Sequence, residues 1–225
     1  MMILFDLDGT LCDSEPGIQR SLAWALKQSG YPVPSDSAIR SIIGPPFTIG
    51  LPRVGVRSED VDRVIATYRA RYQDVGAFEN SVYPGVEDVL SELQSQGHIL
   101  AIATSKPEAS AFPILDHFNL SRFFTVRAGA TLDNSRSAKA DVIQHALNQF
   151  AAKGQQHLDA AWMIGDRRHD VEGAIRHNLR CIGVAWGYGT QEELFEAGAA
   201  AIAHQPQDLF SILQTHAVSR SSTHL

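Results

Sequence analysis

The stretch that decides the fold is Ile3-Leu4-Phe5-Asp6-Leu7-Asp8-Gly9-Thr10-Leu11. It begins with a short apolar run that predicts a buried strand, and Gly9 marks a turn shortly after it. Side chains two positions apart share one face of an extended chain, so Asp6 and Asp8 are expected to enter the same space. In an open parallel sheet, ligands bind in that space, outside the carboxyl ends of the strands. On its own the stretch would suit a tight turn equally well, so the interpretation depends on the rest of the chain.

The composition predicts a folded protein with a sizeable core. The chain has 225 residues, enough for one large domain or for a domain with an insertion, and 44% of them are hydrophobic. The formal net charge of −6 argues against a nucleic-acid binder that relies on a basic surface. No apolar run approaches the roughly 18 residues that a membrane span needs.

Two cysteines, Cys12 and Cys181, are too few for a disulfide framework. Both lie in or beside apolar stretches, which favours buried, reduced thiols and a cytoplasmic location. The amino-terminal residues carry no basic leader and meet Asp6 almost at once, so they are not expected to act as a signal peptide.

A helical block follows the first strand directly. Apolar residues recur at helical spacing from Ile18 to Leu26 and again from Val61 to Tyr72, and no strong strand pattern interrupts them. We therefore expect a helical cap domain over residues 14–83, inserted into an α/β core made of residues 1–13 and 84–225.

After the block, helix and strand patterns alternate. Short apolar runs predict further strands, with helical stripes between them and a last helix that carries Leu209 and Leu213. The predicted strands are Ile99–Ala103, Phe124–Val126, Ala161–Ile164 and Cys181–Ala185. This order predicts an α/β fold, a Rossmann-like parallel sheet with helices on both faces.

Polar side chains follow several of these strands. Thr104 and Ser105 come after the second strand, Lys139 begins a helix after the third, and Asp166 and Asp170 follow the fourth. The carboxyl ends of parallel strands lie along one edge, so one cleft can collect these residues. Two carboxylates ~4 Å apart repel by about 4 kcal/mol at an effective dielectric near 20, and a divalent cation removes that repulsion. Oxygen ligands alone indicate Mg²⁺, with a lysine and a hydroxyl available for a phosphate.

Together these motifs resemble the four motifs of the haloacid dehalogenase superfamily, in the right order and each after its proper element. The motifs are Asp6-Leu7-Asp8-Gly9-Thr10, Thr104, Lys139 and Gly165-Asp166-x-x-x-Asp170. The helical block between the first and second motifs also resembles the capped members of that superfamily.

The resemblance implies a Mg²⁺-dependent phosphomonoester hydrolase with an aspartyl-phosphate intermediate. Asp6 would be the nucleophile, and Asp8 the general acid and then the general base. The metal would be held by Asp6, Asp166 and the backbone carbonyl of Asp8, with Asp170 supporting it directly or through water. Dehalogenases of the superfamily lack the second acidic residue of the first motif. Asp8 is present here, so a dehalogenase is disfavoured.

The resemblance also implies that Thr104, the Ser105 amide and Lys139 bind the transferred phosphoryl group. Lys139 is favoured over Lys106, which is expected to be a flanking residue. Arg40 and the turn at Gly44 could contact the leaving group of the substrate, although the prolines after Gly44 also suit a stiff structural turn.

The closer resemblance is to phosphoglycolate phosphatase-like and 5'-nucleotidase-like members of the superfamily. It rests on stretches such as Thr104-Ser105-Lys106-Pro107 and Trp186-Gly187-Tyr188-Gly189. In the second stretch, the glycine pair itself is expected to be a turn. A small phosphorylated metabolite such as phosphoglycolate is the leading substrate, with a 5'-nucleotide next and a sugar phosphomutase as a further alternative. A catalytically silent binding module on this fold is the alternative from a different class.

Overall fold

The chain forms two compact units. The computed structural model describes residues 1–43, 47–133, 135–153 and 161–221. One unit, which we call the core, contains Met1–Cys12 and Val82–Leu225, and the other, the insert, contains Asp13–Ser81. Among the described residues, no helix is both long enough and apolar enough to cross a membrane.

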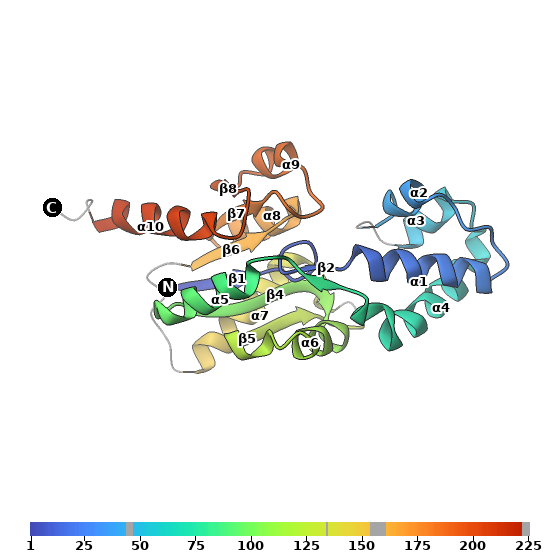
Figure 1. The fold of residues 1–225 in the computed structure, drawn as a ribbon, viewed down its shortest axis with the longest axis horizontal. Helices are drawn as coiled ribbons and strands as arrows, with labels where there is room; N and C mark the ends of the chain where they lie inside the picture. Colours follow the sequence, from blue (N-terminus) through green and yellow to red (C-terminus); the bar gives the residue numbers. More distant parts are fainter. Residues whose placement is uncertain (44–46, 134, 154–160, 222–225) are drawn as a thin grey trace. The chain divides into compact units, whose positions relative to one another are not determined.

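The core is built on a parallel sheet of six strands in the order β5-β4-β1-β6-β7-β8 (Figure 1). The strands are β1 (Met2–Phe5), β4 (Ile99–Pro107), β5 (Phe124–Ala130), β6 (Ala161–Gly165), β7 (Arg180–Val184) and β8 (Ala201–Ala203). The predicted α/β class with a parallel sheet is confirmed. Strand β8 was not predicted from the sequence, because its alanine-rich segment lacks the run of β-branched or aromatic residues that marks most strands.

The first strand lies in the interior of the sheet. Leu4 pairs with Ala101 of β4 on one side and with Met163 of β6 on the other. Met2, Ile3 and Leu4 are fully buried, as expected for a strand with neighbours on both edges and helices on both faces. Because β1 is flanked on both sides, the residues that leave its carboxyl end enter the middle of the sheet edge.

Helices cover both faces of this sheet, and the alternation of side chains along β1 shows how. Met2 and Leu4 belong to a buried cluster with residues of α7 (Lys139–Ala152) and α8 (Arg168–Arg176), among them Ile143 and Val171. Phe5 lies on the other side, around a small space that it shares with residues of α5 (Val86–Ser95) and α10 (Asp208–Ser221). The helices of the core are α5 (Val86–Ser95), α6 (Glu108–His117), α7 (Lys139–Ala152), α8 (Arg168–Arg176), α9 (Gln191–Glu196) and α10 (Asp208–Ser221).

The insert is helical, and the chain enters and leaves it through a two-stranded ribbon of β2 (Cys12–Asp13) and β3 (Ser81–Val82). Its helices are α1 (Glu15–Gln28), α2 (Asp36–Arg40), α3 (Phe47–Arg53) and α4 (Val61–Asp74). Helix α1 packs against α4 through buried apolar residues such as Leu22 and Val64. The side chains of Cys12 and Cys181 are both buried, as expected, and neither cysteine forms a disulfide bond.

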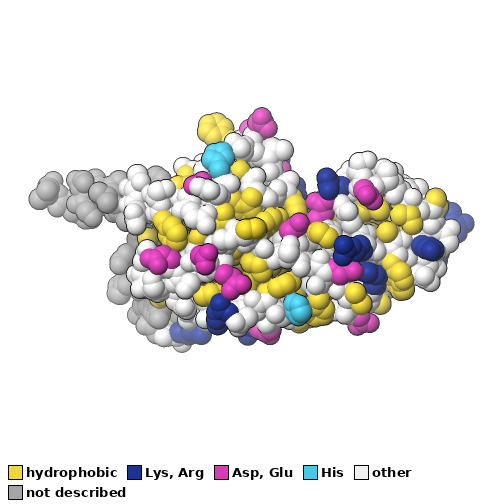
Figure 2. Space-filling model, viewed as in Figure 1, with side chains coloured by type: hydrophobic (Ala, Val, Ile, Leu, Met, Phe, Trp, Pro, Cys, Tyr) yellow, Lys and Arg dark blue, Asp and Glu magenta, His cyan; other side chains and the backbone are white. Residues whose placement is uncertain are grey.

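Basic and acidic side chains are interleaved on the surface of the insert (Figure 2). One of the acidic residues, Asp60, lies at the start of α4, and its side chain is 12% exposed. It accepts hydrogen bonds from the Tyr31 hydroxyl at 2.6 Å and from the guanidinium groups of Arg57 and Arg63, each at 2.6 Å. These bonds favour the ionised carboxylate and hold the pKa of Asp60 well below its ordinary value of 3.8.

We expect Asp60→Asn to lower the stability of the protein at neutral pH. A group whose pKa is lower in the folded state stabilises that state above its unfolded pKa, and the contribution is lost as the pH falls through the folded pKa. The difference in urea midpoint between wild type and variant should therefore be largest at pH 5–7 and shrink below pH 3.8. Asp62→Asn, an exposed change in the first turn of α4, should show no such trend. A wild-type advantage that does not depend on pH would contradict this account.

Candidate active site

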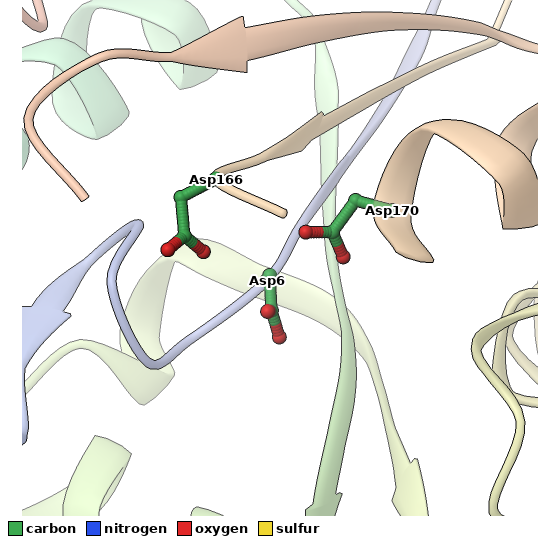
Figure 3. A group of neighbouring side chains, drawn as sticks. All are labelled: Asp6, Asp166 and Asp170. Atoms are coloured by element: carbon green, nitrogen blue, oxygen red, sulfur yellow. The ribbon is translucent and has the colours of Figure 1, made fainter. Parts of the chain in front are cut away.

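Three carboxylates from separate segments meet at the carboxyl edge of the core sheet. Asp6 follows β1, Asp166 follows β6, and Asp170 lies in the first turn of α8. One oxygen of each carboxylate lies within 4.8 Å of one oxygen of each of the others. Figure 3 shows the three side chains turned toward a common space. Asp6 is 9% exposed, Asp166 is fully buried and Asp170 is 1% exposed.

Lys139 provides a buried positive charge beside this group. It is the first residue of α7, and its side chain is 3% exposed. Its Nζ lies 2.9 Å from Oδ1 of Asp6 and 2.7 Å from Oδ1 of Asp170, and it donates a hydrogen bond to the carbonyl of Ala103 at 2.9 Å. The ammonium thus lies against oxygens from the end of β1, from β4 and from α8.

The electrostatics of the group are unfavourable without a further cation. Burial, together with repulsion from Asp170 and Asp6, raises the pKa of Asp166 to about 8. Burial also raises the pKa of Asp6, although the Lys139 ammonium opposes that rise. Burial disfavours the charged form of Lys139, but the carboxylates of Asp170 and Asp6 outweigh it and raise the pKa of Lys139 above its ordinary value.

The residues fit a hard divalent cation. With all four groups ionised, three carboxylates and one ammonium leave two net negative charges in a buried space. The available ligands are oxygen atoms, which suit Mg²⁺ better than a softer metal. A divalent cation would balance the charge and remove the repulsion that raises the pKa of Asp166.

Asp8 has a different partner from Asp6. Its carboxylate oxygens lie 3.1 and 2.9 Å from Nζ of Lys106, whose side chain is 9% exposed. Lys106, which was expected to be a flanking residue, thus contacts one of the two aspartates of the first motif. Strand β4 continues to Pro107 instead of ending at Ala103, so the extended backbone carries Lys106 along the sheet edge toward Asp8.

A signal for Lys106 was present in the sequence. It stands two residues after Thr104, the same spacing that indicated a shared side for Asp6 and Asp8. The two residues are also linked locally, because the Lys106 amide donates to the Thr104 hydroxyl at 3.2 Å.

The remaining residues expected at the site differ in location and in exposure. Thr104 is buried on β4, next to β1 in the sheet, whereas Ser105 is exposed. Arg40 belongs to the insert, where its exposed guanidinium forms an ion pair with Glu15. Gly44 lies outside the described residues. The structure thus brings Asp6, Asp166, Asp170 and Lys139 into contact range, and it places Asp8 with Lys106.

Comparison with known proteins identifies the family. A model described as "Haloacid dehalogenase-like hydrolase" matches residues 3–184. The chain belongs to this hydrolase family. It is accordingly an enzyme, and a phosphatase of that family, as the resemblance of its motifs implied.

Three of the most similar proteins illustrate the range of the family. A tyrosine-protein kinase, PtkA, from Mycobacterium tuberculosis is 39% identical over 203 residues, which are 90% of this chain and 68% of that protein. A 5'-nucleotidase from Pseudomonas aeruginosa is 38% identical over 205 residues, covering 91% of this chain and 88% of that protein. The crystal structure of a predicted phosphatase from Clostridium acetobutylicum superposes with a TM-score of 0.82 at 39% identity, covering 95% of this chain and 98% of that one.

Removal of the buried ammonium should destabilise the enzyme. Lys139→Met leaves Asp6 and Asp170 without their compensating charge, and breaking a buried ion pair from one side costs about 3–5 kcal/mol. Urea unfolding in the presence of EDTA should show a loss of at least ~3 kcal/mol in the free energy of unfolding. Lys153→Met, at the other end of α7, removes only an exposed contact to the Thr125 carbonyl and should change stability little. Equal stability of the two variants would exclude Lys139 as the compensating charge.

Proposed function

We propose that this phosphatase hydrolyses phosphomonoesters of small metabolites with the help of Mg²⁺, and that Asp6 is its nucleophile. The observation that carries the proposal is the buried group of Asp6, Asp166 and Asp170, with the Lys139 ammonium in contact with the first and the third. A nucleophilic carboxylate must be ionised to attack, and Lys139 opposes the effect of burial on Asp6.

The carboxylates of Asp6, Asp166 and Asp170 would hold the ion, together with the backbone carbonyl of Asp8. Bound there, Mg²⁺ supplies positive charge against the phosphoryl oxygens. On the protein side, the Thr104 hydroxyl, the Ser105 amide and Lys139 bind the same phosphoryl group.

The reaction proceeds in two displacements. A carboxylate oxygen of Asp6 forms a bond to phosphorus while the bond to the ester oxygen breaks, and Asp8 donates a proton to the departing alcohol. Asp8 then accepts a proton from a water molecule, whose oxygen attacks phosphorus and releases inorganic phosphate from Asp6. Lys106 contributes by holding Asp8 through both carboxylate oxygens.

Asp6→Asn is expected to abolish phosphate release from p-nitrophenyl phosphate while leaving the protein folded, because the amide cannot act as the nucleophile. The fall in kcat should be at least ~1,000-fold. EDTA should abolish phosphate release by the wild type, and added Mg²⁺ should restore it. Far-UV circular dichroism and the urea midpoint serve as controls for folding. Unchanged turnover by Asp6→Asn would remove Asp6 from the nucleophile role, and EDTA-resistant turnover would remove the metal.

The choice of substrate rests on the relatives. The 5'-nucleotidase is 38% identical to this chain, whereas phosphoglycolate phosphatase from Pseudomonas putida is 32% identical over 195 residues, 83% of this chain and 70% of that protein. We therefore place 5'-nucleotides ahead of phosphoglycolate, reversing the order that the sequence motifs suggested. Arg40 and Gly44 of the insert are retained as proposed contacts of the leaving group.

A second candidate activity is transfer of a phosphoryl group to a tyrosine hydroxyl. It is favoured by the 39% identity to the mycobacterial tyrosine-protein kinase, which extends over 90% of this chain. The kinase reaction would deliver the phosphoryl group of a nucleoside triphosphate to a side chain instead of to water. Both activities would use the same carboxylate and metal site.

A panel of phosphate esters distinguishes these activities. With Mg²⁺, we expect kcat/KM to be highest for a 5'-nucleoside monophosphate, followed by phosphoglycolate, with one inorganic phosphate released per ester consumed. Label from [γ-³²P]ATP should appear as inorganic phosphate and not on protein tyrosine. Stable phosphotyrosine would favour the kinase reaction, and turnover of a sugar phosphate without phosphate release would favour a mutase.

A further inference from the structure

The loop Trp186–Gly189, which follows β7, lies against the most deeply buried carboxylate of the site. Its glycine pair is expected from the sequence to be a turn, and the loop has no role in the proposed mechanism. We propose that this loop is a positioning element that fixes the Asp166 carboxylate for the metal ion, and that Gly187 and Gly189 are required for it. This inference rests on the proposed metal site and adds residues to it.

Both oxygens of Asp166 receive hydrogen bonds from the protein. The Tyr188 amide donates to Oδ2 at 2.8 Å, and the Thr10 hydroxyl donates to Oδ1 at 3.3 Å. The donors are themselves connected, because the Trp186 indole Nε1 donates to the Thr10 carbonyl at 3.1 Å. The loop after β7 and the turn after β1 are thereby joined around a single carboxylate.

The two glycines are needed for close approach and not for an unusual backbone conformation. Neither Gly187 nor Gly189 is among the glycines with positive φ, so a turn conformation does not by itself demand glycine there. A Cβ at position 187 would lie 2.3 Å from Cβ of Asp166 and 2.3 Å from the carbonyl oxygen of Gly9. A Cβ at position 189 would lie 2.0 Å from the backbone oxygen of Asp166. Contacts this short do not occur, so any larger residue must displace the loop or Asp166.

Gly9, in the turn after β1, also approaches this carboxylate closely. Gly9 has a φ of 78°, and a Cβ there would lie 2.2 Å from Oδ2 of Asp166 and 2.8 Å from Cδ2 of Tyr188. Asp166 is thus in close contact with two backbone segments, the turn after β1 and the loop after β7. Residues that orient a ligand in this way typically change metal affinity 10–100-fold when they are altered.

A rigid carboxylate should matter more for some cations than for others. Mg²⁺ requires near-octahedral geometry with short bonds, whereas Ca²⁺ accepts variable geometry and longer bonds. Displacement of Asp166 should therefore weaken Mg²⁺ binding more than Ca²⁺ binding. A variant that is merely less stable would weaken both equally or neither.

The test compares Gly187→Ala with Gly97→Ala. Gly97 has a φ of 78° and nothing within 4 Å of its hypothetical Cβ, so its substitution strains a turn without contacting Asp166. Isothermal titration calorimetry of the full chain without substrate gives the Kd for Mg²⁺ and for Ca²⁺, and circular dichroism checks folding. We expect Gly187→Ala to raise the Kd for Mg²⁺ at least ~10-fold, with a smaller change for Ca²⁺. Gly97→Ala should bind both ions as the wild type does.

Trp186→Phe provides a second variant in case Gly187→Ala does not fold. It removes the indole donor to Thr10 without adding atoms, and one lost hydrogen bond should raise the Kd for Mg²⁺ about threefold. If wild type binds Mg²⁺ and the folded loop variants bind it equally well, the positioning role is overturned while the proposed metal site stands. If wild type itself does not bind Mg²⁺, the proposed metal site fails, and the positioning role with it.

Discussion

The ion pairs of Lys139 with Asp6 and Asp170 are the interaction on which the catalytic edge depends. Three carboxylates are withdrawn from water within 4.8 Å of one another, and mutual repulsion alone would drive them apart or protonate them. Lys139 reaches them because it begins α7, a helix that packs against β4, β5 and α8. The packing of α7 on the sheet therefore also places the positive charge that balances the carboxylates.

The sheet order explains why the acids meet. Strand β1 lies between β4 and β6, and parallel pairing brings the ends of all three to one edge. Asp6 and Asp166 leave neighbouring strands, and Asp170 follows in the first turn of the next helix. Insertion of a separate helical unit directly after β1 leaves this edge intact, because the strand itself is held by its neighbours and not by the turn that follows it.

Each of the two aspartates of the first motif forms an ion pair with a different lysine. Lys139 contacts Asp6, while Lys106 contacts Asp8. The neighbouring acids can thus remain in different environments although only one residue separates them. Asp166 has no lysine partner among the described ion pairs, and it is held instead by hydrogen bonds from Thr10 and Tyr188.

The sequence by itself determined the α/β class, the parallel sheet, the helical character of the insert and the identity of the acids at the strand ends. These features depend on local periodicity and on the rule that parallel strands end at one edge. Strand β8 was not predicted, because its segment has few of the β-branched and aromatic residues that indicate a strand. Only the tertiary structure decided that Lys106 meets Asp8 and that Gly187 and Gly189 lie against Asp166. Lys106 and Asp8 are 98 residues apart, and the two glycines are 21 and 23 residues from Asp166. Their contacts follow from how strands and loops pack in space, which no local pattern of residues records.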